Sequence, residues 1–306
     1  MYLSLVISFI IWLPKSGVDH LKFIFLATTI VFIIGIRDDL TPMKPIFKLI
    51  NQLIPSLLVF FFFDVAIESF YGTIDVIQFP FVLKLLITIF TIIVITNSFN
   101  LIDGIDGLAG SIAILACSVL GSWFYMIGQI YLSTLCFAIF SVGLAFLYYN
   151  WSPSKIFMGD TGALMIGFLL ACLIIIFLNK NQDLDYYHPF KFSNPITICI
   201  SILVLPLTDT LRVFIIRIRK GVSPFFPDNN HLHHLLLSKG YSHSKTVFIL
   251  IFINLVALFI AYFTSTISDV LALPLLILAI ILFVWLISKK TTSDKVTNIT
   301  ISESKT

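Results

Sequence analysis

Charged side chains are scarce in this sequence. Asp, Glu, Lys and Arg make up 11% of the 306 residues, whereas 58% of the residues are hydrophobic. A soluble domain of this composition would expose a large apolar surface, so a soluble globular protein is excluded. Apolar runs of roughly 17 to 25 residues, each long enough to cross a bilayer as a helix, recur along the chain. The sequence therefore predicts an all-α, polytopic transmembrane helical bundle.

Motifs of several other protein classes are missing as well. No G-x-x-x-x-G-K-[ST] loop occurs, which argues against a P-loop ATPase. The four cysteines have no C-x-x-C spacing and lie within apolar runs: Cys117, Cys136, Cys172 and Cys199. We expect them to be small buried hydrophobic residues rather than disulfide or metal ligands. The first apolar segment lacks the basic region and cleavage site of a signal peptide.

The charges that flank the apolar runs predict an orientation in the membrane. About ten spans are expected, at roughly 2–13, 21–36, 46–65, 79–97, 107–128, 130–148, 161–178, 195–216, 246–265 and 270–288. With alternating crossings, 14 of the 19 basic residues fall on one side, and the other side receives Lys15, Lys22, Lys84, Lys180 and Lys191. The positive-inside rule places the more basic side in the cytoplasm.

Four polar segments follow spans on that cytoplasmic side. They are GIRDDLTPMKPIFK (35–48), NSFNLIDGIDGLAG (97–110), NWSPSKIFMGDTG (150–162) and RIRKGVSPFFPDNNHLHHLLLSKGYSHSK (217–245). A charged side chain within the bilayer costs several kcal/mol, so such residues are functional by default. The loops on the opposite side contain acids but no glycine-framed motif. We therefore predict one site at the cytoplasmic face.

The first segment places Asp38 and Asp39 at the end of a helix. Adjacent carboxylates point to different faces of a helix, so we expect at most one of them to meet a given ligand. The alternative is a solvated helix terminus. Acids at a helix C-terminus oppose the helix dipole, however, so other groups must hold them.

The second segment carries a polar stripe at helical spacing. Its polar residues recur every three positions: Asn97, Asn100, Asp103 and Asp106. Glycines recur at the same interval, where we expect a ligand to approach the backbone closely: Gly104, Gly107 and Gly110. Helix–helix packing through small and polar residues is the alternative. That alternative suits asparagine and glycine but not two aspartates.

In the third segment, Asp160 lies at the start of a helix. An aspartate there can simply cap the helix. It can also bind Mg²⁺, which takes one or two carboxylates together with substrate phosphates. Phe157 could stack on a base or could be a packing aromatic.

The fourth segment contains His231, His233 and His234. Zinc is one interpretation, but no fourth ligand has zinc-like spacing. The nearby Arg217 and Arg219 favour a phosphate or sugar site instead.

Three other polar residues lie outside these assignments. Asp209 lies close to Arg212 in the sequence, and an ion pair explains it as well as chemistry does. No specific role is expected for His188 or His243.

Carboxylates, amides, lysines and histidines at one membrane face suit phosphoryl transfer, which depends on positioning and on charge stabilisation. The segments GIRDDLTPMKPIFKLINQ, NSFNLIDGIDGLAG, IFMGDTGALMIG and PDNNHLHHLLLSKG resemble, in order and spacing, the polyprenyl-phosphate N-acetylhexosamine-1-phosphate transferases. These belong to the glycosyltransferase 4 and phospho-N-acetylmuramoyl-pentapeptide transferase superfamily.

The resemblance runs over residues 20–288. It implies transfer of a sugar 1-phosphate from a UDP-N-acetylhexosamine to polyprenyl (undecaprenyl) phosphate, with release of UMP, at the start of cell-envelope polysaccharide synthesis. The H-x-H-H form resembles the branch that uses UDP-N-acetylglucosamine or a related sugar.

The resemblance also implies roles for residues on the donor side. Asp160 and Asn100 would hold Mg²⁺, with Mn²⁺ as an alternative. Asp106 and Phe157 would recognise uracil, and Lys48 would contact the diphosphate.

On the acceptor side, Asp38 and Asp39 would lie beside the incoming polyprenyl phosphate, with Asp38 as proton acceptor or orienting group. Asp103 would line the cleft without an assigned role. The sugar or pyrophosphate would be contacted by His231, His233 and His234.

The resemblance further implies a multi-pass protein of the inner membrane, with its active site facing the cytoplasm. We expect a single catalytic domain over residues 1–288 and a polar cytoplasmic tail over 289–306. Partners would be the two substrates and the bilayer, with no nucleic acid; a homodimer is left open. The N-terminal helix and basic loop usual in the family match nothing before Met1. An ion-coupled transporter and an inactive, truncated family member are the alternative interpretations.

Overall fold

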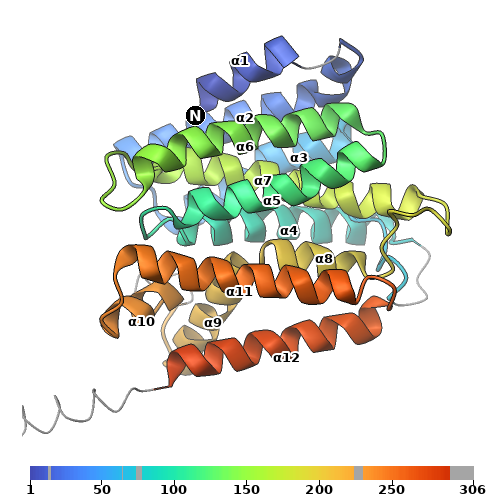
Figure 1. Cartoon of the computed structure of the whole chain (residues 1–306). Coiled ribbons are helices and arrows are strands. Elements are labelled where there is room, and N and C mark those ends of the chain that lie inside the picture. The colour runs from blue at the N-terminus through green and yellow to red at the C-terminus, as the bar shows by residue number, and fades with distance from the viewer. Residues whose placement is uncertain (13–14, 64, 74–77, 224–229, 290–306) are drawn as a thin grey trace, which may run out of the picture.

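The chain folds as a bundle of α-helices. The computed structural model describes residues 1–12, 15–63, 65–73, 78–223 and 230–289. All regular elements within these residues are helices: α1 (Tyr2–Trp12), α2 (Lys15–Leu40), α3 (Pro45–Phe62), α4 (Phe81–Leu101), α5 (Leu108–Met126), α6 (Ile130–Asn150), α7 (Gly159–Asp183), α8 (Pro195–Ile202), α9 (Val204–Arg219), α10 (Leu232–Ser238), α11 (His243–Phe263) and α12 (Asp269–Ser288). Figure 1 shows the long helices lying side by side, and the all-α prediction is confirmed.

The expected count of ten spans is not confirmed. Among the described residues, seven helices are long and apolar enough to cross a membrane, or eight if α8 and α9 form one bent span. The span predicted at 195–216 is broken, because these two helices meet at an angle of 79°. Helix α1 has 11 residues, fewer than the roughly 17 needed to cross a bilayer. Most of the tail predicted over 289–306 lies outside the described residues.

Helix α7 is the centre of the bundle. Its apolar, membrane-spanning stretch is 94% buried, whereas that of the peripheral helix α12 is only 17% buried. Helices α2, α4 and α5 pack directly against α7. The close approach of α2 depends on Gly35, since a Cβ there would lie 2.4 Å from the Cα of Thr161. Because α7 is buried among these helices, they determine where its first turn lies, and this turn carries Asp160.

The cysteine prediction is confirmed. All four cysteines are free and buried within the helices. A buried free cysteine behaves as a small hydrophobic residue, so these side chains contribute to packing.

The four predicted polar segments gather at one end of the bundle. The ends of α2, α4 and α6 meet the starts of α3, α5 and α7 there, and Asp209 of α9 holds the start of α10, which packs against the turn after α4. Helix α10 lies at this end, where it packs against α11 and α12 (Figure 1). The predicted clustering at a single face therefore holds in three dimensions.

Candidate active site

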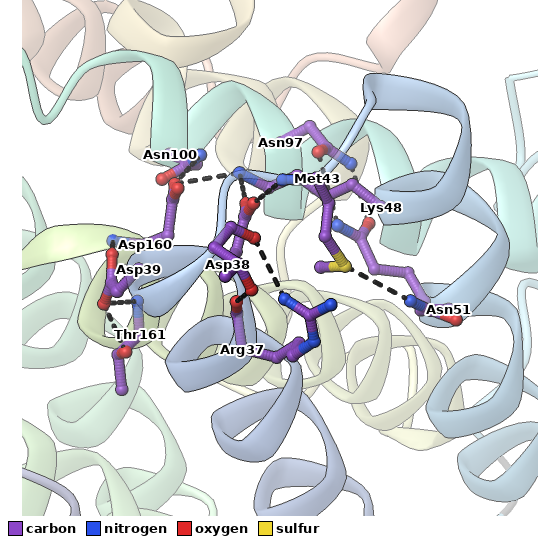
Figure 2. A network of polar contacts seen from close by, with 12 residues as sticks. Arg37, Asp38, Asp39, Met43, Lys48, Asn51, Asn97, Asn100, Asp160 and Thr161 are labelled. Atoms are coloured by element: carbon purple, nitrogen blue, oxygen red, sulfur yellow. Dashed lines mark hydrogen bonds and ion pairs between the residues drawn. The ribbon is translucent and has the colours of Figure 1, made fainter.

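Lys48 lies at the centre of a network that joins three distant parts of the sequence (Figure 2). Its Nζ lies 2.8 Å from Oδ2 of Asp38 and 2.8 Å from Oδ1 of Asp160. The same oxygen of Asp160 accepts a hydrogen bond of 2.7 Å from Nδ2 of Asn100. One ammonium group thus offsets two carboxylates contributed by α2 and α7, and its side chain is only 14% exposed.

The two adjacent aspartates of α2 face different partners. Oδ1 of Asp38 accepts the backbone N–H of Met43 at 2.7 Å, and its other oxygen faces Lys48. The carboxylate of Asp39 instead binds the N-terminus of α7. It accepts the backbone N–H groups of Asp160, at 2.9 Å, and of Thr161, at 3.0 Å, and also the Thr161 hydroxyl. The expectation that the pair would diverge is confirmed, and these contacts are what hold two acids at a helix C-terminus.

Gly159 makes room for this contact. Its φ of +65° lies in the left-handed region, and a Cβ would come within 2.9 Å of Oδ2 of Asp39. A side chain at this position would therefore be strained and would push Asp39 away from α7.

Asp160 does not cap its own helix. Asp39 binds the helix N-terminus, and Oδ1 of Asp160 accepts from Lys48 and Asn100. Oδ2 of Asp160 accepts no hydrogen bond from the described residues, and the side chain is 32% exposed. The capping interpretation is therefore not supported. The carboxylate is instead available to a ligand.

The oxygen atoms around Asp160 resemble the open kind of site that Mg²⁺ uses, and not a site closed by protein ligands alone. Among the described residues, no group of three or more His, Cys, Asp or Glu side chains is arranged to hold a metal. One carboxylate and the amide oxygen of Asn100, completed by substrate phosphate oxygens and water, make a set that Mg²⁺ accepts. The zinc interpretation of the histidines gains no support from this geometry.

The polar stripe of the second segment divides between two tasks. Asn97 exchanges amide hydrogen bonds of 2.7 and 3.3 Å with Gln52 and so joins α4 to α3. Asn100, one turn later, faces Asp160. The helix-packing alternative therefore applies to Asn97 but not to Asn100.

Asp103 and Asp106 lie in the turn between α4 and α5. Burial, together with the negative charges of Asp160 and Asp39, raises the pKa of Asp103 to about 7. Oδ2 of Asp106 accepts the N–H of Ser154 at 3.4 Å and lies 3.8 Å from Nδ1 of His243. His243, for which no role was expected, thus lies at the site.

Asn150 connects this turn to the loop that carries Phe157. Its Oδ1 accepts the N–H of Gly107 at 2.9 Å, and its Nδ2 donates to the carbonyl of Ile156 at 2.8 Å. Sequence reasoning did not single out this buried residue, since a lone asparagine at the end of an apolar span gives no signal. Phe157 is 78% exposed and is therefore free to stack on a ligand.

The three histidines form a compact group on and beside α10. The ring centroids of His233 and His234 are 4.2 Å apart, and those of His231 and His233 are 5.7 Å apart. Burial and the neighbouring His234 lower the pKa of His233 to about 4, so this ring is neutral at pH 7. Its buried Nε2 has no hydrogen-bond partner among the described residues. Buried polar atoms normally form hydrogen bonds, so Nε2 of His233 is a candidate contact for a ligand.

Asp209 holds this group against α9. Its Oδ2 lies 2.7 Å from Nδ1 of His231, and its Oδ1 accepts the N–H of Leu232 at 2.8 Å. Arg212 donates to the carbonyl of Asn230. Asp209 lies on α9, the helix that follows the 79° bend after α8.

The glycines of the second segment were expected to clear space for a ligand, but they face protein. A Cβ at Gly104 would lie 2.9 Å from Nε2 of His233, and one at Gly107 would lie 3.1 Å from the Trp151 ring. They allow the second, third and fourth segments to pack closely, which sequence spacing alone could not distinguish from ligand access.

Comparison with known proteins agrees with this geometry. The profile described as glycosyl transferase family 4 matches residues 21–178, which is more than half of the chain. The chain is 31% identical over 233 residues to the probable undecaprenyl-phosphate N-acetylglucosaminyl 1-phosphate transferase of Bacillus subtilis (strain 168), covering 74% of this chain and 61% of that protein. It is 30% identical over 241 residues to the undecaprenyl-phosphate alpha-N-acetylglucosaminyl 1-phosphate transferase of Escherichia coli (strain K12), covering 76% and 62%. The protein of that name from Yersinia pestis is 27% identical over 252 residues, covering 80% and 66%.

The chain thus spans slightly less than two thirds of the length of these relatives. The extent of the profile match shows that the chain belongs to glycosyl transferase family 4.

Proposed function

We propose that this protein transfers N-acetylglucosamine 1-phosphate from UDP-N-acetylglucosamine to a polyprenyl phosphate such as undecaprenyl phosphate, releasing UMP. The observation that carries the proposal is Lys48, held between Asp38 and Asp160 and next to Asn100. Such a site can bind phosphate oxygens and a divalent cation side by side, as phosphoryl transfer requires. The names of the relatives supply the sugar and the lipid.

Asp160 and Asn100 would hold Mg²⁺, or alternatively Mn²⁺. When bound, the ion would offset the negative charge of the donor diphosphate. Lys48 adds a fixed cation beside it. The ammonium group has three donors and can contact a phosphate oxygen while it keeps its ion pair with Asp38.

In the proposed reaction, an oxygen of the polyprenyl phosphate forms a bond to the phosphorus that carries the sugar. The bond from this phosphorus to the bridging oxygen breaks, and UMP leaves with the electron pair. A phosphate monoester has a second pKa of about 6, so the acceptor is largely a dianion at pH 7 and needs little help from a base.

The contacts of the two aspartates of α2 favour this direct route over a phospho-aspartate. Asp38 is 5% exposed and engaged by Lys48 and Met43, whereas Asp39 uses both oxygens on α7. Neither carboxylate is presented as a free nucleophile. Asp38 would orient the acceptor or take a residual proton, and Asp39 would position Asp160.

Recognition would involve the remaining predicted residues. Phe157 would stack on uracil, beside Asp106. His233 and His234 would contact the sugar or pyrophosphate, with His231 fixed by Asp209. The acids of the Lys48 network lie at helix ends rather than in mid-membrane, so this geometry does not favour an ion-coupled carrier.

The test is a transfer assay with the purified full-length chain in lipid nanodiscs. We expect radiolabel from UDP-[³H]GlcNAc to appear in the lipid extract only when undecaprenyl phosphate and Mg²⁺ are both present, with one UMP released per sugar transferred. A panel of UDP-sugars defines the donor. Stoichiometric UMP release without lipid acceptor, with phosphate trapped on Asp38 or Asp39, would contradict the direct route. Absence of transfer to lipid with every donor would contradict the proposed function.

A further inference from the structure

A cavity lies away from the Lys48 network, between α11 and α12. It is a groove of about 680 Å³, within the range of about 300–1,000 Å³ typical of small-molecule sites. Its walls are almost entirely apolar and include Phe252 of α11 and Leu286 of α12, which are 62% and 51% exposed. None of the Lys48 network, the histidines or Asp209 lines this groove. It is therefore separate from the candidate active site.

The groove is charged at one end only. Two of its lining residues are lysines, Lys239 and Lys245, and none of its lining residues is acidic. Lys239 follows α10, and Lys245 lies in the first turn of α11. Both therefore lie at the end of the bundle that carries the candidate active site, while the groove continues along the apolar helices.

Each of the two ammonium groups contacts a neighbouring residue. Nζ of Lys239 donates to the carbonyl of Lys289 at 2.7 Å, and Nζ of Lys245 lies 4.9 Å from the centre of the Tyr241 ring. An ammonium group has three donors, so each keeps N–H groups for an anion. The carbonyl contact also places the start of the chain after α12 next to Lys239.

We infer that this groove binds an anionic membrane phospholipid. An acyl chain would lie along the apolar walls, and the phosphate would lie between Lys239 and Lys245. Basic pockets between membrane helices at the cytoplasmic face recognise anionic head groups in this way, since that leaflet has a negative surface potential. The lysine and arginine distribution assigns this end of the bundle to that face.

Such a lipid would also hold α10. Leu236 of α10 lines the groove, and Lys239 directly follows the same short helix. His233 and His234 lie one turn earlier on it. A bound lipid would thereby restrict the motion of these histidines. This consequence for catalysis rests on the proposed function, whereas lipid binding itself does not.

Native mass spectrometry of the full-length protein in detergent tests the site, with phosphatidylglycerol and phosphatidylcholine of the same acyl chains as probes. We expect phosphatidylglycerol to bind more tightly. The Lys239→Gln/Lys245→Gln double variant should lose about 30-fold of this affinity, the effect of two lysines at a membrane surface. The Lys239→Arg/Lys245→Arg variant should retain it, and so should Lys180→Gln, at the other end of the bundle.

Equal binding of the two lipids, or unchanged phosphatidylglycerol binding in the glutamine variant, would overturn the inference. Tighter binding of undecaprenyl phosphate, lost in the same variant, would make the groove a polyprenyl site and would also overturn it. A protein dimer that excludes the lipid would do the same. If phosphatidylglycerol binds as expected but no sugar is transferred in any lipid, the proposed function fails while the lipid site stands.

Discussion

The carboxylate of Asp209 lies 2.7 Å from Nδ1 of His231, and both groups are buried. An ionised carboxylate only accepts hydrogen bonds, so this contact favours the tautomer with the proton on Nδ1 and leaves Nε2 facing away from Asp209. The other carboxylate oxygen binds the N–H of Leu232. One acid thus fixes both the orientation of a histidine ring and the start of α10.

Substitution of Asp209 by Asn should lower the transfer rate by roughly 10- to 100-fold, since the charge is lost and only one of the two buried acceptor oxygens remains. The reason is misorientation of His231, so His231→Gln combined with Asp209→Asn should cost no more than the larger single effect. Asp209→Glu should recover part of the activity. A double variant whose losses add fully would contradict the positioning role.

Asp39 and Asp160 should respond differently to neutral substitution. Asp160→Asn removes the only carboxylate proposed for Mg²⁺ and should abolish transfer, while thermal unfolding stays close to that of the wild type. Asp39→Asn should lose activity only in part, because asparagine keeps one of the two acceptor oxygens that bind the N–H groups of Asp160 and Thr161. Asp39→Ala should lower the free energy of unfolding by about 0.5–2 kcal/mol. Retained Mg²⁺-dependent turnover in Asp160→Asn would refute the metal assignment.

Asp103 should make stability depend on pH in metal-free buffer. Its pKa in the folded protein is raised to about 7, above the ordinary value of 3.8. The folded state therefore binds more protons between these values, and stability falls as the pH rises from about 4 to 7. The loss amounts to at most about 4 kcal/mol.

The Asp103→Asn variant should remove this dependence. Its midpoint temperature, measured in EDTA between pH 5 and pH 8, should change less than that of the wild type and exceed it at pH 8. Parallel curves for the two proteins would show that Asp103 is not the group responsible.

Gly104→Ala should impair transfer without unfolding the protein. The new methyl group would lie 2.9 Å from Nε2 of His233 and would displace the ring. Gly110→Ala is the matched control, because its methyl group would approach the Phe146 ring only to 3.4 Å. We expect a clear loss of kcat in the first variant and near-normal activity in the second. Equal activities would mean that His233 tolerates displacement and does not bind the substrate.

Cysteine accessibility tests the proposed orientation. In a background without the four native cysteines, Lys44→Cys and Lys155→Cys should resist an impermeant maleimide in intact cells. Tyr187→Cys, at a residue that is 91% exposed at the opposite end, should be labelled. The reverse pattern would place the candidate active site outside the cell.

Much of this architecture follows from the sequence alone. Apolar runs of membrane-spanning length predicted the helices, and alternation of their direction predicted that residues as distant as Lys48 and Asp160 would meet at one end. The divergence of Asp38 and Asp39 followed from helix geometry. These features depend on local periodicity and on chain direction, both of which can be read along a single segment.

Other features were decided only by tertiary packing. No pattern within residues 35–48 indicates that Asp39 binds the N-terminus of α7, and none indicates that Asp209, which follows the 79° bend between α8 and α9, pairs with His231. The close contact of Gly104 with His233 likewise depends on how two segments meet. Hydrophobic periodicity determines which face of a helix is buried. The partner of each polar side chain depends on helix rotation, close approach and bends, which are set by the packing of the whole bundle.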